Sequence, residues 1–280
     1  MKIFTSNLHM HTTFSDGKNT PEEYAQTAIK AGMSSLGFSD HAYVPNDIGF
    51  SMKEGVLPEY FRELERLKEK YSGQIEIYIG LEGDASNMPS REGLDYLIGS
   101  VHYLFDKASG TRHSVDYMPD NPRDAVSDLR DNVNGGDIRK TVEWYYEAVI
   151  DLVSRHKFDI LGHIDLIVKR NDAKKYFDPT SDWYLRTTAR VVEAVKASGC
   201  ILEVNTGAVN RGFASHPYPG KHVLSQVFAA GIPVTISSDA HGVENIRSNF
   251  DLAASVLREA GYRCVIQMQN GKLTEISLNE

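Results

Sequence analysis

The feature that most constrains the fold is a repeated alternation of short apolar segments with longer amphipathic segments. The short segments are predicted strands and the long ones are predicted helices, because their apolar residues recur at strand and helix periodicity respectively. The predicted strands cover residues 3–8, 35–39, 75–81, 96–101, 158–162, 200–204, 232–236 and 262–267. The predicted helices cover residues 20–32, 57–71, 138–155, 183–198, 223–230 and 250–260.

The first of these helices carries clear signals at both of its ends. Thr20 is a typical N-cap, Pro21 occupies the first helical position, and Glu22 and Glu23 place negative charge in the first turn. Gly32 is a typical residue for ending the helix.

Strands that alternate with helices indicate a parallel sheet with helices packed outside it. About seven such units without a linker favour a closed α/β barrel over an open sheet, and 280 residues suit a barrel built as one domain over residues 1–280. The sequence has no glycine-rich phosphate loop of the nucleotide-binding types. The polar stretch 105–136 is predicted to be a long loop with little regular structure, which is typical of lids and binding loops.

Composition excludes some classes of partner. Thirty Lys and Arg residues against 38 Asp and Glu give a net charge of -8, which argues against a broad nucleic-acid-binding surface. The N-terminus lacks a signal-peptide core and no apolar run approaches the roughly 20 residues of a membrane span, so we expect a cytoplasmic protein without a membrane partner. Cys200 and Cys264 lie in apolar stretches and are predicted to be reduced core residues.

Histidines and carboxylates follow almost every predicted strand. Because the carboxyl ends of barrel strands converge on one rim, where catalytic sites are built, these residues are expected to be neighbours in space. They are His9, His11 and Asp16 after the first strand, Asp40 and His41 after the second, Glu82 and Asp84 at the third, His102 at the fourth, His163 and Asp165 at the fifth, and Asp239 and His241 at the seventh.

The spacing of these residues suits metal binding. His9 and His11 are two apart on an extended chain, so both rings face one side, roughly 6.6 Å apart along the strand. Asp239 and His241 repeat this spacing, and Glu82 can bridge two ions because a carboxylate has two oxygens. Mixed imidazole and carboxylate ligands suit zinc, iron or manganese. The candidate ligands outnumber what one ion can use, so two or three divalent metal ions are implied.

A lone histidine near a strand end is more often a hydrogen-bonded surface residue than a metal ligand. Six histidines together with several carboxylates at the strand ends favour the metal-binding interpretation. The remaining histidines fall in predicted loops or on helix faces and are assigned no ligand role: His113, His156, His216 and His222.

These motifs resemble the PHP superfamily, named for polymerase and histidinol phosphatase domains. The matching stretches are Leu8-His9-Met10-His11-Thr12, Phe38-Ser39-Asp40-His41, Gly80-Leu81-Glu82, Gly99-Ser100-Val101-His102, Leu161-Gly162-His163-Ile164-Asp165 and Ser237-Ser238-Asp239-Ala240-His241. The resemblance implies a distorted (β/α)7 TIM-like barrel with three metal ions. It implies that one metal binds His9, His11, Glu82 and Asp239, a second binds Glu82, His102 and His163, and a third binds Asp16, His41 and His241.

Within the superfamily, the chain is most similar to the monofunctional histidinol-phosphate phosphatase branch. Three features suggest this: Asp16 where other branches often carry His, the strand end 203–207, and Arg211 followed by Pro217-Tyr218-Pro219. The resemblance implies hydrolysis of a small phosphorylated metabolite, L-histidinol phosphate, to L-histidinol and phosphate in histidine biosynthesis.

The expected nucleophile is a metal-bridging hydroxide rather than a side chain. His241 or Asp165 is expected to protonate the leaving oxygen if an acid is needed. Arg211 is the best predicted phosphate ligand, and Lys169 and Arg170 are weaker candidates. Acids in the stretch 105–136 are candidates to receive the amine and imidazole of the substrate: Asp106, Asp116, Asp120 and Asp124.

Three alternatives remain open. An amidohydrolase-type barrel also opens with two histidines two apart, but it usually adds a bridging lysine from a middle strand, which this sequence lacks. A PHP-type nuclease or phosphodiesterase acting on a short nucleotide or another small phosphoester is compatible with the motifs. A non-catalytic module that uses metals only to hold its fold is disfavoured, because structural sites are normally smaller and closed. The sequence does not predict the oligomeric state.

Overall fold

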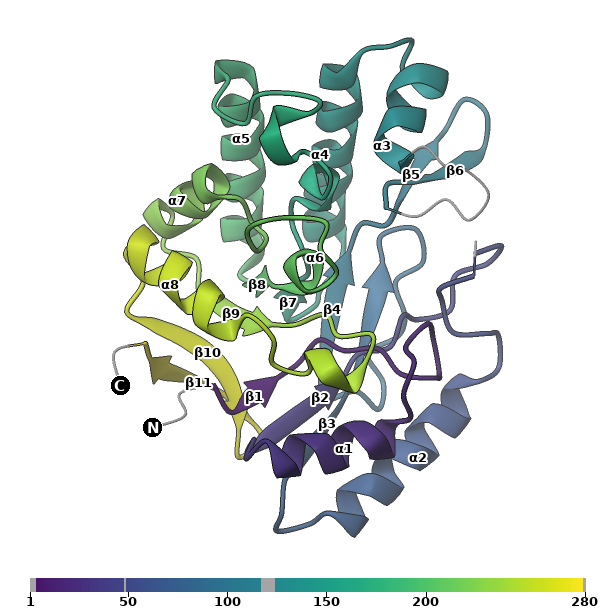
Figure 1. The fold of residues 1–280 in the computed structure, drawn as a ribbon. Coiled ribbons are helices and arrows are strands. Elements are labelled where there is room, and N and C mark those ends of the chain that lie inside the picture. Colours follow the sequence, from purple (N-terminus) through teal and green to yellow (C-terminus); the bar gives the residue numbers. More distant parts are fainter. Residues whose placement is uncertain (1–3, 48, 117–123, 279–280) are drawn as a thin grey trace.

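Seven parallel strands form the central sheet of the protein. The structure is a computed structural model that describes residues 4–47, 49–116 and 124–278. The strands lie in the order β1–β2–β3–β4–β7–β8–β9 (Figure 1). Their bounds are β1 (Ser6–Asn7), β2 (Ser35–Phe38), β3 (Glu76–Asp84), β4 (Tyr96–Ser100), β7 (Ile160–Leu161), β8 (Ile201–Asn205) and β9 (Val234–Ser237).

The sheet curls until its first and last strands meet beyond their carboxyl ends. Met10 and Ala240 form a parallel bridge there, and the amide of His11 donates to the carbonyl of Ala240 at 2.8 Å. The result is a nearly closed, TIM-like α/β barrel, as predicted.

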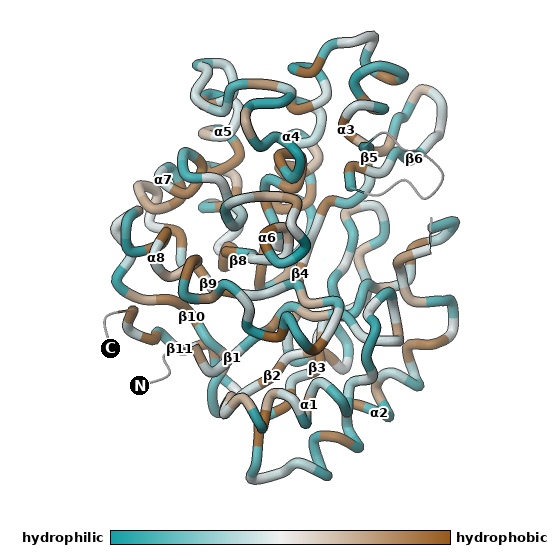
Figure 2. The backbone as a smooth tube through the Cα atoms, in the orientation of Figure 1, coloured by the Kyte–Doolittle hydropathy of each residue, from teal (hydrophilic) through white to brown (hydrophobic). Residues whose placement is uncertain are grey.

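Helices cover the outside of this barrel (Figure 1). The long ones are α1 (Pro21–Lys30), α2 (Leu57–Lys70), α4 (Ile138–Arg155), α5 (Asp182–Ser198), α7 (Lys221–Ala229) and α8 (Phe250–Ala260). Hydropathy alternates along them (Figure 2), as expected when one side of each helix faces the sheet. The predicted start of α1 is confirmed, because the Thr20 side chain accepts from the Glu23 amide while the Glu23 carboxylate accepts from the Thr20 amide. None of the helices among the described residues has the length and apolar character needed to cross a membrane.

The strands β1 and β7 are only two residues long, shorter than the predicted segments 3–8 and 158–162. At β1 the chain leaves the ladder early, because the His9 amide donates to the Asn7 side chain at 3.2 Å. The residues that follow β1 then continue to the rim of the barrel, where Met10 pairs with Ala240. The sequence pattern marks the apolar run, but it does not mark where strand pairing stops.

The prediction of little regular structure in 105–136 is wrong. It contains most of an antiparallel hairpin, β5 (Tyr103–Asp106) with β6 (Thr111–Ser114), then α3 (Ala125–Asp128) and one π-helical turn (Leu129–Val133). The Asp124 side chain caps α3 by accepting from the Ser127 amide at 3.0 Å. These elements are too short to give a periodic signal and depend on contacts with the rest of the protein. Asp120 lies outside the described residues.

The last predicted strand exists but does not belong to the barrel. β10 (Cys264–Gln269) pairs antiparallel with β11 (Lys272–Ser277), a strand that was not predicted. The Ser35 hydroxyl at the start of β2 donates to the Met268 carbonyl at 2.7 Å, which places this hairpin at the amino-terminal end of the barrel. Met268 belongs to the same buried apolar cluster as Leu8 and Ile160. The hairpin therefore closes the end of the barrel opposite to the rim.

Tyr96 fills the interior of the barrel. It is fully buried, and its hydroxyl lies 2.6 Å from the Leu8 carbonyl and 3.0 Å from the Phe38 carbonyl. A Cβ atom at Gly37 would lie 2.5 Å from the Tyr96 hydroxyl, and one at Gly80 would lie 2.4 Å from its ring. Glycine is therefore needed at both positions, because a methyl group would have to displace the ring.

Both cysteines are free, as predicted, but only Cys200 is buried, and Cys264 is partly exposed.

Candidate metal centre

The nine predicted metal ligands lie together at the carboxyl-terminal rim of the barrel. They come from six of the seven strands, and all are buried except Asp16 and His241, which are partly exposed. They are His9, His11 and Asp16 after β1, His41 after β2, Glu82 in β3, His102 after β4, His163 after β7, and Asp239 and His241 after β9.

Glu82 lies at the centre of this group, with imidazole nitrogens facing both of its oxygens. The distances from Oε2 are 2.9 Å to His41 Nδ1, 3.3 Å to His9 Nε2 and 3.6 Å to His11 Nε2. Those from Oε1 are 3.0 Å to His163 Nε2 and 3.4 Å to His102 Nε2. A carboxylate placed between two sets of ligands in this way is positioned to bridge two cations.

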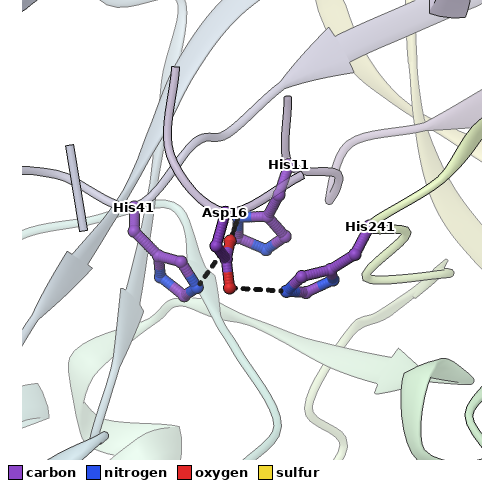
Figure 3. Close-up of side chains that lie close together, drawn as sticks. All are labelled: His11, Asp16, His41 and His241. Atoms are coloured by element: carbon purple, nitrogen blue, oxygen red, sulfur yellow. Dashed lines mark ion pairs between the residues drawn. The ribbon is translucent and has the colours of Figure 1, made fainter. Parts of the chain in front are cut away.

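A second group surrounds Asp16 (Figure 3). Its Oδ2 lies 3.3 Å from His241 Nε2, and its Oδ1 lies 3.8 Å from His41 Nε2 and 4.0 Å from His11 Nδ1. The four ligand atoms of this group all lie within 4.8 Å of one another. His11 also directs Nε2 toward Glu82, so its ring lies between the two groups.

Asp239 is held in an uncommon backbone conformation, with φ at 48°. Its Oδ1 lies 3.2 Å from His11 Nε2, and its Oδ2 accepts from Arg211 Nη2 at 3.2 Å. A Cβ atom at Gly207 would lie only 2.8 Å from this Oδ2. A glycine is therefore needed at position 207. Strained residues of this kind cluster at functional sites.

Several buried nitrogen and oxygen atoms of the cluster lack hydrogen-bond partners. Buried polar atoms are nearly always paired, so each unpaired one needs an explanation. Within the described residues, the unpaired cluster atoms are His9 Nε2, both ring nitrogens of His11, Asp16 Oδ1, Glu82 Oε2 and the Nδ1 atoms of His102 and His163. Unpaired imidazole nitrogens that face unpaired carboxylate oxygens fit divalent cations, which accept lone pairs from both.

The pKa shifts of two central residues favour the forms that bind cations. Burial acts to raise the pKa of Glu82, but the imidazoles of His9, His102 and His41 outweigh it and hold this pKa well below the ordinary value. Burial and the neighbouring imidazoles of His41 and His241 lower the pKa of His11 to about 3. An anionic carboxylate and a neutral imidazole are the forms in which these groups bind metal ions.

A cavity of about 360 Å³ lies over the cluster, and the predicted phosphate-binding residues line its wall. Lys169, Arg170 and Arg211 line this cavity together with several of the nine candidate ligands. Arg211 Nη1 lies 3.1 Å from His241 Nδ1, and the Arg170 guanidinium lies 4.5 Å from the centre of the Phe213 ring.

Lys169 is buried and forms an ion pair with Asp116, which lines the same cavity. Burial lowers the pKa of Lys169. Burial acts in the opposite sense on Asp116, but the positive charges of Lys169 and Arg211 lower its pKa to about 2. A buried cation and a partly exposed anion thus lie side by side at the cavity wall.

Asp165 is not brought to this cavity. It is fully buried, its Oδ2 accepts from the Gly220 amide at 2.7 Å, and it lines a separate cavity of about 240 Å³. Burial raises its pKa to about 6. Of the two predicted proton donors, only His241 lines the cavity above the cluster.

The structure also reveals supporting carboxylates to which no role was assigned from the sequence. Asp40 accepts from the Thr12 amide at 2.7 Å and from the Ser15 hydroxyl at 2.6 Å, which fixes the loop that carries Asp16. Asp84 accepts from the His102 amide at 2.7 Å. Both acids lie within two residues of a predicted ligand in the sequence, and this proximity was the available signal. The four histidines that were assigned no ligand role lie outside the groups of candidate ligands.

The PHP domain pattern matches residues 7–207 of this chain, about seven-tenths of its length. The chain belongs to the PHP family. The matched residues include the candidate ligands from His9 to His163, while Asp239 and His241 lie beyond them and join the cluster through the closure of the barrel.

The curated relatives of this PHP chain carry one activity in their names. A protein of Deinococcus radiodurans named "probable histidinol-phosphatase" is 32% identical over 270 residues, which cover 92% of this chain and 94% of the relative. The histidinol-phosphatase of Bacillus subtilis is 27% identical and matches 83% of this chain and 92% of its own length.

Two crystal structures share the fold of this chain. A protein of Listeria monocytogenes assigned as a histidinol phosphatase has a TM-score of 0.74 at 22% identity, over 88% of this chain and 98% of its own. The histidinol phosphate phosphatase of Lactococcus lactis, complexed with zinc, L-histidinol and phosphate, has a TM-score of 0.64 at 21% identity, over 96% of this chain and 98% of its own.

Proposed function

We propose that this PHP protein is a metal-dependent phosphatase that hydrolyses L-histidinol phosphate to L-histidinol and phosphate. The observation that carries the proposal is one cavity that joins a cluster of imidazole and carboxylate ligands to three cationic side chains. In such a cavity, anionic phosphoryl oxygens can be bound both by metal ions in the cluster and by the cationic side chains. The names of the Deinococcus and Bacillus relatives support the choice of substrate.

Three divalent metal ions are held, in this proposal, by the nine side chains of the cluster. Glu82 would be the bridging ligand, because it is completely buried at the centre of the cluster and each of its oxygens faces at least two imidazoles. Asp16, His41 and His241 would hold another of these ions. When bound, such ions supply positive charge that polarises a phosphoryl group and lowers the pKa of a water molecule toward about 7. The donor set suits zinc, iron or manganese.

Arg211 binds and orients the phosphoryl group. Its guanidinium is fixed by Asp239 and His241, and its Nε is buried without a partner among the described residues. A guanidinium held in this way keeps its planar fork ready for two phosphate oxygens, with little conformational entropy left to lose. His241 lines the same cavity, and in this proposal it is a metal ligand rather than the proton donor to the leaving oxygen, because an imidazole that binds a cation must be neutral.

Asp116 is the acid that receives the ammonium group of the substrate. Asp106 bonds to Ser109 on the exposed hairpin, and Asp124 caps α3, so neither lines the cavity. Asp116 does line it, and its pairing with Lys169 shows that this position already holds an amine. The substrate ammonium would take the place of Lys169 at Asp116 and release Lys169 toward the phosphate.

The test is a comparison of kcat/KM for L-histidinol phosphate with that for glycerol phosphate, phosphoserine, a mononucleotide, a phosphodiester and a cyclic amide. We expect the highest value for L-histidinol phosphate, activity that is lost on chelation, and recovery when zinc or manganese is added back. A preference for the diester or the cyclic amide would contradict the proposal in favour of the alternative barrel hydrolases. Metal binding without turnover of any ester would indicate a non-catalytic module.

A metal-ligand variant adds a second test. Asp239→Asn should lower both metal content and turnover, since it removes a ligand charge from the cluster. Asp178→Asn is the matched control, because Asp178 pairs with Lys174 on the surface, away from the cavity.

A further inference from the structure

We infer that Glu203 is a positioning residue that holds the imidazole of His9 in one tautomer, with Nε2 directed into the metal cluster. The inference rests on the metal binding proposed above and assigns a role to β8, the only barrel strand that supplies none of the nine candidate ligands.

Glu203 is completely buried, and both of its oxygens are occupied by donors. Oε1 lies 2.5 Å from His9 Nδ1 and accepts from the Ser237 hydroxyl. Oε2 accepts from the His163 amide and from Asn205 Nδ2, each at 2.9 Å. Asn205 has its amide nitrogen toward Glu203 because its oxygen accepts from the Gly207 amide at 2.7 Å. Three partners from neighbouring segments and one from β8 itself therefore fix the position of this carboxylate.

The contact with Glu203 decides which nitrogen of His9 is free. A neutral imidazole carries one N–H group and one lone pair, and a carboxylate oxygen beside Nδ1 keeps the proton on Nδ1. The lone pair then lies on Nε2, which is 3.3 Å from Glu82 Oε2 and 3.9 Å from Asp239 Oδ1. Nε2 has no hydrogen-bond partner among the described residues. This chain of carboxylate, imidazole and cation site is how proteins commonly orient a metal-binding histidine.

His11 provides the contrast within the same cluster. Its Nδ1 has no hydrogen-bond partner in the described part of the chain, and the carboxylates of Asp239 and Glu82 both face its Nε2, at 3.2 and 3.6 Å. A buried carboxylate in contact with Nδ1 therefore distinguishes His9 from His11.

The same carboxylate also connects two metal sites. It contacts the side chain of His9, assigned to the first metal, and the backbone of His163, assigned to the second. Glu203 reaches both because β8 lies next to β7 in the sheet and its side chain points into the barrel. Loss of Glu203 should therefore weaken both sites together.

The decisive variant is Glu203→Gln, which nearly preserves the shape of the side chain. All four partners act as donors, so the new amide NH2 group must face a donor on one side or the other. We expect zinc affinity, measured by titrating the metal-free protein, to fall 10- to 100-fold, the usual effect of losing such a contact. Ser237→Ala is the matched control, because it removes a partner of the same oxygen while leaving His9 in contact with Glu203. Its zinc affinity should change less.

The tautomer itself is read by NMR of the zinc-loaded protein with nitrogen-15-labelled histidine. The signals of His9 are assigned by their loss in His9→Gln. We expect a protonated Nδ1 with a strongly downfield proton in the wild type and in Ser237→Ala, and loss of that downfield signal in Glu203→Gln. A wild-type His9 protonated on Nε2 would overturn the inference, as would a Glu203→Gln protein with unchanged zinc affinity.

These readouts separate the inference from the proposed function. If the wild type turns over no phosphate ester but shows the Nδ1 proton and binds zinc, the proposed function fails and the role of Glu203 stands. If Glu203→Gln does not fold, the wild-type tautomer still decides the inference, and Glu203→Asp gives a variant that keeps the charge. Glu203→Asp is expected to recover part of the lost zinc affinity.

Discussion

The hydroxyl of Tyr96 donates a hydrogen bond of 2.6 Å to the main-chain carbonyl of Leu8, the residue that immediately precedes His9. The bond connects β4 to the segment that follows β1, across the interior of the barrel. It therefore fixes the start of the segment that carries His9 and His11. The closeness of Tyr96 to Gly37 and Gly80 shows that this arrangement has no spare volume.

The first prediction concerns this packing. Gly80→Ala should lower the free energy of unfolding by roughly 1–3 kcal/mol, the usual cost of overpacking a filled core. Its new methyl group would lie 2.4 Å from the Tyr96 ring. Urea denaturation measures the change. In a Tyr96→Leu background the same substitution should cost less, because the ring is gone. Equal costs in both backgrounds would show that the ring is not the obstacle.

The second prediction concerns Arg211, whose guanidinium lies 3.2 Å from Asp239 and lines the cavity. Arg211→Ala should lower kcat/KM for the phosphate ester about 10- to 100-fold, since a hydrogen bond to a charged group contributes roughly 1.5–3 kcal/mol. Arg211→Lys should recover only part of this, because it restores the charge without the planar fork. Arg170→Ala is the comparison variant with a smaller expected effect. An unchanged kcat/KM in Arg211→Ala would remove Arg211 from the proposed mechanism.

The third prediction concerns the metal ion that Asp16, His41 and His241 would hold. Asp40 accepts three hydrogen bonds from the loop before Asp16: two from Thr12, at 2.7 and 2.9 Å, and one from Ser15 at 2.6 Å. Asp40→Asn replaces an acceptor oxygen with a donor, which should loosen the loop and weaken binding of this ion. Elemental analysis after dialysis should show the metal content falling from three ions per chain toward two. Ser15→Ala should have a milder effect, and full retention of three ions in Asp40→Asn would contradict the prediction.

The fourth prediction concerns acid stability. Burial acts to raise the pKa of Asp124, but hydrogen bonds from Tyr176, Lys175 and the Ser127 amide lower it to about 2. Its pKa in the unfolded chain is about 4. A carboxyl group with a lowered folded-state pKa stabilises the fold above its unfolded pKa, and this contribution is lost as the pH falls from about 4 through about 2.

Asp124→Asn tests this sign, because asparagine can still cap α3 but does not titrate. The difference in unfolding free energy between wild type and variant should be largest at neutral pH and should shrink between pH 4 and pH 2. Urea denaturation at pH 7, 4 and 2.5 measures it. A difference that is constant across these pH values would show that the charge of Asp124 does not stabilise the fold.

Much of the site was predictable because all parallel strands of a barrel have their carboxyl ends at the same rim. A residue at the end of any strand therefore lies near the residues at the ends of the others. His9, Glu82 and His241 are far apart in the sequence, yet each follows or ends a strand whose carboxyl end reaches the same place. Recognising strand ends was therefore enough to bring the candidate ligands together, even where strand lengths were wrong.

The hairpin and α3 were not predictable because long-range contacts hold them in place. Arg112 in β6 donates to the carbonyl of Pro45, and Asp124 at the start of α3 pairs with Lys175. Neither partner is visible from local periodicity. β10 was wrongly predicted to be a barrel strand because its apolar run resembles one. It pairs antiparallel with β11 instead, and this pairing is visible only in the structure.

The role of Glu203 was missed, although the sequence contains a signal for it. An acidic residue lies in the middle of Ile201–Asn205, a strand whose residues are all buried. A buried carboxylate must have partners, and those partners, His9 and Ser237, could not be identified without the fold.

The hairpin of β10 and β11 follows all seven barrel strands in the chain, so the ribosome makes it after them. Domains tend to fold from the N-terminal side while synthesis continues at roughly 5–20 residues per second. A nascent chain that already has every barrel strand would still lack Met268, so the buried apolar cluster that contains Leu8 and Ile160 would be incomplete. For that interval the unfinished barrel is a natural client for chaperones, and the last strands to emerge are those that complete the cluster.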